Sequence, residues 1–183
     1  GEGALEEEEE EATEEMVRQK EYQKGWIVRQ FRKCYGERPD VDLNPYVRDW
    51  MKRHPHGSVH VGCDSKVMRN RIVYAIAIVL RLPGVGGHVI YSKRSQPRHG
   101  YNNVMLRLNN EVRQSVEAAE ALLDVVDSRK ICVHVDLAGR HGSLSHQLHA
   151  MATGWITGVG LTPFAKPDSW AASAVAHRFC QTW

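Results

Sequence analysis

The chain has 183 residues, of which 42% are hydrophobic and 25% charged, and its formal net charge is +2. This length and composition suit one domain with a substantial core and leave little room for two. Neither a secretory leader nor an apolar run of about 18 residues is visible, which predicts a soluble, cytoplasmic protein. The four cysteines are scattered without a CxxC pair, which argues against a zinc site and against a disulfide framework.

Residues 1–21 form an acidic segment of low complexity. They hold ten Glu against Arg18 and Lys20, whereas the remainder carries 22 Lys and Arg against 12 Asp and Glu. We expect a disordered or frayed tail in front of a basic body that favours a polyanionic partner, most commonly nucleic acid. Two alternatives stay open: the basic surplus could be ordinary solubility charge, and the tail could fold over the basic face in imitation of a nucleic-acid backbone.

Two helices are expected in an N-terminal helical segment that spans residues 22–55. Apolar residues recur at helical spacing through 16–35, at Trp26, Ile27, Phe31 and Cys34. A second helix is expected to begin at Asn44, with Pro45 in its first turn, and to end near Pro55.

From residue 56 the hydrophobic pattern changes, and a domain covering 56–183 is predicted. Short turns join three strands, which indicates an antiparallel meander at 58–64, 71–81 and 87–94. Helices and strands then alternate, with a helix at 104–126, a strand at 130–136, a helix at 143–155, a strand at 156–164 and a last helix opened by Pro167. The order β-β-β-α-β-α-β-α predicts an α/β fold with a mixed five-stranded sheet flanked by helices.

Acidic residues stand at the ends of the two most strand-like segments. Asp64 closes VHVGCD and Asp136 closes ICVHVD, while Glu111 lies between them on an expected helix. If the two strands are neighbours and the helix crosses the sheet, the three carboxylates converge. Hydrolysis of a phosphodiester commonly uses two Mg²⁺ ions about 3.5–4 Å apart, held by carboxylates from separate elements. Three acids on a basic body therefore predict a metal-dependent site that acts on phosphodiesters.

Each acid also has an ordinary structural interpretation. Asp64 and Asp136 could be turn residues at strand ends. Glu111 could be a solvent-exposed helical residue that pairs with Arg107 one turn earlier. The position of the Glu111 side chain separates the two interpretations: if it points into solvent, its assignment to the site is wrong.

Residues 44–180 resemble the ribonuclease H-like superfamily, and more narrowly its YkuK-type branch of bacterial and phage proteins. The matching pieces are VHVGCDSK, LRLNNEVRQS, HVDLAG, SLSHQL, GWITGVG and KPDSWAASAVAH. The resemblance implies a ribonuclease H-like nuclease that uses two Mg²⁺ or Mn²⁺ ions, with Asp64, Glu111 and Asp136 as ligands. It also implies RNA, an RNA/DNA hybrid or structured DNA as the partner. The alternative is an inactive member that binds nucleic acid without cutting it.

The superfamily usually takes a fourth metal-site acid from its last helix, and here two residues compete for that place. Asp168 is the only acid there, whereas His177 stands where relatives are expected to keep an acid. Positions nine residues apart lie on opposite faces of a straight helix, so the two cannot both point inward. Asp168 could instead cap the helix. Lys166 could neutralise a phosphate or orient a carboxylate, or be an ordinary surface lysine.

Polar residues around these acids give weaker signals. Ser145 is a minor candidate, and the HxxH pair of His146 and His149 is interpreted as exposed histidines because no carboxylate stands at helical spacing. Tyr91 could stack on a base, although packed tyrosines are commoner. Basic residues that follow the first and third strands are expected to cluster at the rim of the sheet: Lys66, Arg69, Arg71, Lys93, Arg94 and Arg98.

Overall fold

One mixed β-sheet runs through the described part of the chain, which comprises residues 31–33, 40–98, 103–139 and 145–180 of the computed structural model. Its strands are β1 (Phe31–Lys33), β2 (Asp40–Val41), β3 (Ser58–Val67), β4 (Arg71–Leu82), β5 (Gly86–Pro97), β6 (Ile131–Ala138) and β7 (Thr162–Lys166). Their order is β2-β1-β5-β4-β3-β6-β7, with β3, β6 and β7 parallel and the other pairs antiparallel. The α/β class and the meander are confirmed. The acidic tail predicted for residues 1–21 lies outside the described residues.

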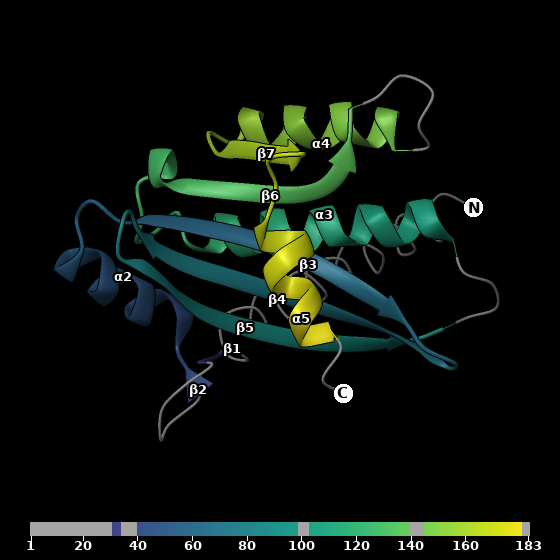
Figure 1. Ribbon diagram of the computed structural model, residues 1–183, viewed down its shortest axis with the longest axis horizontal. Helices are drawn as coiled ribbons and strands as arrows, with labels where there is room; N and C mark the ends of the chain where they lie inside the picture. The colour runs from purple at the N-terminus through teal and green to yellow at the C-terminus, as the bar shows by residue number, and fades with distance from the viewer. Residues whose placement is uncertain (1–30, 34–39, 99–102, 140–144, 181–183) are drawn as a thin grey trace, which may run out of the picture.

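Helices cover both faces of the sheet (Figure 1). They are α2 (Leu43–Arg53), α3 (Val104–Ala121), the short η1 (Ser128–Lys130), α4 (His146–Gly158), and a π-helical stretch η2 (Ala171–Ala176) that continues into α5 (His177–Cys180). We call η2 and α5 together the C-terminal helix. Within the described residues, no helix is both long enough and apolar enough to cross a bilayer.

The two faces of β3 contact different helices. Successive strand residues point to opposite sides, so Ser65 meets α3 while Asp64 and Gly62 meet the C-terminal helix. Strand β4 is buried without interruption from Val73 to Leu80, because helices cover it from both sides. Its continuous apolar run therefore reflects a central strand.

The N-terminal segment corrects two expectations. The described sheet has seven strands where five were predicted, and Phe31–Lys33, expected to be helical, forms β1. It pairs with β5 and β2, and Phe31 is fully buried, so sheet pairing outweighs the helical spacing. The predicted second helix is confirmed as α2, but its cap is Asp42, and the Asn44 side chain donates to the Ala121 carbonyl instead.

The C-terminal part corrects two more. The strand expected over 156–164 begins only at Thr162, because Ile156 to Gly158 still belong to α4. Gly160 then reverses the chain with a φ of +84°. Pro167 does not open the last helix, which starts at Ala171 after a turn in which the N–H groups of Asp168 and Ser169 bond to Ala165.

The C-terminal helix touches the backbone of β3 at Gly62. A Cβ atom at this position would lie 2.4 Å from the nitrogen of Ala172 and 2.5 Å from the carbonyl carbon of Ala171. Both contacts are with backbone, so no side-chain rotation can relieve them. Glycine is therefore required two residues before Asp64 for the helix to reach the sheet.

We predict that Gly62→Ala destabilises the fold by about 1–3 kcal/mol, because the helix must move away from β3. The matched control is Gly154→Ala in α4, where a Cβ meets nothing within 4 Å. Alanine there should leave stability unchanged or raise it by up to about 1 kcal/mol. Denaturant unfolding of both variants measures the difference, and equal stabilities would contradict the close approach at Gly62.

Candidate active site

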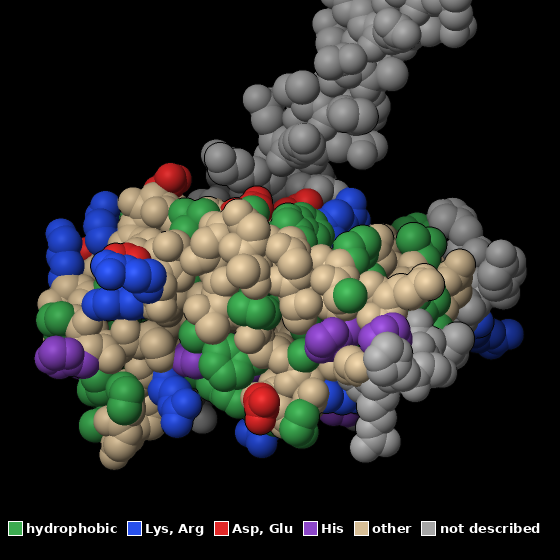
Figure 2. Space-filling model, turned by 90° about the horizontal axis from the view of Figure 1, so that it is seen from above, with side chains coloured by type: hydrophobic (Ala, Val, Ile, Leu, Met, Phe, Trp, Pro, Cys, Tyr) green, Lys and Arg blue, Asp and Glu red, His purple; other side chains and the backbone are tan. Residues whose placement is uncertain are grey.

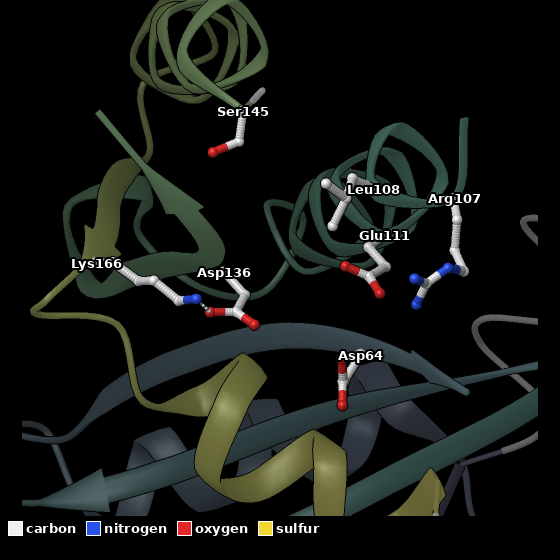
Figure 3. Close-up of a pocket in the computed structure, with 7 residues that line it drawn as sticks. All are labelled: Asp64, Arg107, Leu108, Glu111, Asp136, Ser145 and Lys166. Carbon is white, nitrogen blue, oxygen red and sulfur yellow. Dashed lines mark ion pairs between the residues drawn. The ribbon is translucent and has the colours of Figure 1, made fainter. Parts of the chain in front are cut away.

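A pocket opens between β3, β6, β7 and α3, and all three predicted acids line it (Figure 3). Its volume of about 410 Å³ corresponds to roughly a dozen water molecules, enough for a phosphate with hydrated cations. The lining residues are Asp64, Arg107, Leu108, Glu111, Asp136, Ser145 and Lys166. Glu111 is only 5% exposed, so the alternative of a helical glutamate in solvent is wrong.

The pocket forms where β3 and β6 cease to pair. The last pair of the parallel ladder joins Gly62 to His134, and Asp64 and Asp136 each stand two residues further along their own strands. Asp64 and Asp136 therefore occupy equivalent places on two strands that separate, and α3 crosses above the gap with Glu111. The two strands and the helix thus bring the three acids to one pocket, but the expected strand end at Asp64 is wrong, since β3 continues to Val67 and Asp64 pairs with Ala75 inside it.

The carboxyl group of Glu111 is hydrogen-bonded to the Ser65 hydroxyl and is shielded from solvent. Ser65 donates its O–H to the Glu111 carboxyl at 2.5 Å and accepts an N–H from Arg107 at 3.1 Å. Burial raises the pKa of Glu111 to about 8, and the nearby charges of Asp64 and Asp136 act in the same direction against the opposing effects of Ser65 and Arg107. At neutral pH without a cation, this carboxyl carries a proton.

The two aspartates have cationic or hydrogen-bonding partners of their own. Lys166 lies 3.0 Å from the nearer oxygen of Asp136, as the dashed line in Figure 3 marks. His177 Nδ1 lies 2.6 Å from Asp64 Oδ2. Burial raises the pKa of Asp64, and the contact with His177 opposes this effect. Each of the three carboxyl groups thus has a different neighbour, although the buried Asp136 Oδ1 makes no hydrogen bond with the described residues.

The structure favours His177 over Asp168 as the fourth residue near the acids. Neither residue belongs to the pocket lining, and Asp168 is exposed in the turn after β7. His177, although its side chain is 54% exposed, reaches Asp64 from the first turn of α5. Only one of the two competing residues therefore meets the site.

The chemistry of the donor set fits a hard divalent cation, because carboxylate oxygens are the ligands that Mg²⁺ and Mn²⁺ prefer. Among the described residues, however, no group of three or more His, Cys, Asp or Glu is already arranged around a common metal position. Lys166 and His177 draw two of the carboxylates toward themselves. A cation would have to replace these partners and the proton on Glu111.

Fold and site together define an α/β domain with carboxylates gathered where β3 and β6 cease to pair. A family model described as Ribonuclease H-like matches residues 44–181, so the chain belongs to the ribonuclease H-like family. This match confirms the resemblance carried by the sequence motifs. A search of curated proteins found no match.

Sequence reasoning missed a buried pair of histidines beneath the C-terminal helix. His134 Nδ1 accepts the N–H of Trp170 at 3.1 Å, so its proton is on Nε2, which donates to His60 Nδ1 at 2.8 Å. His60 Nε2 then donates to Ser58 at 2.8 Å. These three hydrogen bonds can form together only while both imidazole rings are neutral. The available signal was the motif VHV on both strands.

This pair anchors the helix that carries His177. The ring of His134 stacks on Phe164 with centroids 4.8 Å apart and meets the ring of Trp170 edge-on at 4.6 Å. Burial lowers the pKa of His60 to about 4 and that of His134 to about 3. The start of the C-terminal helix is therefore tied to β6 by a neutral side chain.

We predict that stability falls as pH decreases from 6.5 toward 4, because the unfolded chain protonates both histidines and the folded chain does not. His134→Phe should flatten that part of the profile and cost about 2–4 kcal/mol at pH 7, since the Trp170 N–H loses its acceptor. Urea unfolding at several pH values measures both effects. His56→Gln, at an exposed position, serves as control. If stability in His134→Phe depends on pH as steeply as in the wild type, the histidine pair is not the cause of that dependence.

Proposed function

We propose that the protein is a nuclease that hydrolyses phosphodiester bonds in nucleic acid with the help of Mg²⁺ or Mn²⁺. The observation that carries the proposal is the convergence of Asp64, Glu111 and Asp136 on one pocket, from two parallel strands and a crossing helix. Membership of the ribonuclease H-like family supports it. The excess of Lys and Arg outside the first 21 residues suits a polyanionic substrate.

In this mechanism the three carboxylates would hold the ions, which supply charge neutralisation and activation of water when bound. Lys166, displaced from Asp136, would be close enough to the pocket to contact a phosphate oxygen. Ser65 keeps Glu111 directed toward the aspartates, and Arg107 holds Ser65 in turn. His177 holds Asp64 through its Nδ1, and this contact would have to open for the carboxylate to turn to a cation.

We predict that Asp64→Asn and Asp136→Asn each lower the cleavage rate by at least about a hundredfold, because each removes a negatively charged oxygen ligand. Asp124→Asn, on the exposed surface, is the control, and Asp168→Asn should also keep activity. The assay follows cleavage of single-stranded RNA, RNA/DNA hybrid and branched DNA with Mg²⁺ or Mn²⁺. Cleavage that survives in Asp64→Asn would exclude this site.

An inactive nucleic-acid-binding module is the second candidate, and one observation favours it. Lys166 pairs with Asp136 and His177 bonds to Asp64, and these contacts can stabilise the fold without any cation. On this interpretation the pocket keeps its architecture but has lost the anionic fourth position. Wild-type protein would then bind all three substrates and cut none of them.

Replacing the histidine by an acid tests which candidate is correct. In His177→Asp a second carboxylate would stand beside Asp64, so like-charge repulsion should lower the melting temperature in chelator and Mn²⁺ should restore it. If the wild-type protein is inactive, this variant is expected to gain cleavage. His177→Ala separates loss of the imidazole from gain of the acid. A Mn²⁺-independent melting temperature in His177→Asp would show that position 177 does not reach the metal site.

A further inference from the structure

The ends of β3, β4 and β5 carry a basic surface beside Asp64. Cross-strand partners share a face of the sheet, and the register aligns Asp64 with Ala75 and Ala75 with Lys93. Lys66 and Arg71 alternate in phase with these residues and so lie on the same face. Together with Arg69 in the turn between β3 and β4, they form what we call the hairpin platform: Lys66, Arg69, Arg71 and Lys93.

The tip of the platform is hollowed. A second pocket of about 420 Å³ lies there, lined by Met68, Arg69, Asn70, Arg71, Ser95, Gln96 and Pro97. Arg98 braces the turn, because its backbone N–H bonds to Asn70 at 3.0 Å and its guanidinium bonds to the Met68 carbonyl at 3.2 Å. The lining offers guanidinium, amide and hydroxyl groups and contains no carboxylate, a combination suited to phosphate oxygens.

The charge of this region is one-sided. Between Ser58 and Arg98, Asp64 is the only acidic residue, whereas Lys and Arg recur along the same stretch. The face above α4 and β7 differs, since outside the grey residues its centre has few charged side chains, and Asp and Glu lie among the Lys and Arg of its margin (Figure 2). The positive charge is therefore not spread evenly as solubility charge would be.

We propose that the hairpin platform binds the sugar–phosphate backbone of the nucleic acid whose scissile phosphate lies at Asp64, an inference that rests on the proposed function. Three to five strand residues separate Asp64 from the tip, or about 10–15 Å at 3.3 Å per residue. At about 3.4 Å per nucleotide along a duplex, the tip contacts phosphates roughly three to five nucleotides from the cleavage position. The platform thus sets a minimum substrate length.

The test compares Arg69→Ala/Arg71→Ala, both at the tip, with the matched control Lys52→Ala/Arg53→Ala, two exposed basic residues on α2 at the other end of β3. Binding of labelled RNA and duplex probes is measured by fluorescence anisotropy in chelator, over a salt series. On probes of roughly 20 nucleotides the platform variant should lose about two units of salt slope and at least about tenfold in affinity. On probes of roughly three nucleotides, too short to reach the tip, it should match the wild type.

Unchanged slope and affinity on long probes, or an equal loss in the α2 control, would overturn the platform. Failure of wild-type protein to bind any probe would overturn it too. Cleavage is scored separately with Mn²⁺. If wild-type protein cuts while the platform variant binds and cuts normally, the platform is wrong and the nuclease stands. If the platform variant loses binding but wild-type protein never cuts, the platform stands and the nuclease is wrong.

Discussion

The burial of carboxyl groups close to one another is the constraint on which the rest of the site depends. Two ionised carboxylates close together in a partly buried place are costly unless something neutralises them. Here burial raises the pKa of Glu111 to about 8 and Ser65 donates to its carboxyl, while Asp136 pairs with Lys166 and Asp64 bonds to His177. Divalent cations would satisfy all three at once, so the same side chains support either a metal site or a set of internal pairs.

The C-terminal helix decides how Asp64 is satisfied. It approaches β3 closely because position 62 lacks a side chain, and its first N–H groups meet His134. These two anchors place His177 over the sheet face that carries Asp64. Alternation along β3 gives the opposite face to α3, where Ser65 meets Glu111. Adjacent residues of one strand therefore connect the pocket to helices on both sides of the sheet.

Much of this architecture could be predicted because its signals are local. The long apolar run of β4, the helical stripe of α3 and the acids that follow the apolar runs of β3 and β6 can each be recognised within about a dozen residues. Strands β1 and β2 could not be predicted, since two- or three-residue strands have no period and are stabilised by pairing. The histidine pair was missed because a histidine on an apolar strand has no distinctive neighbour in the sequence.

The sequence by itself determined the fold class, the basic body and the three acids at the pocket, since apolar period and residue type specify these locally. Only the tertiary structure decided which partner each acid has. Asp64 and His177 are 113 positions apart, and Ser65 and Glu111 are 46 apart. Such contacts depend on how strands pair and where a helix touches the sheet. The choice between Asp168 and His177 was also decided by the tertiary structure. No local pattern predicted the turn that delays the start of the last helix and leaves Asp168 outside it.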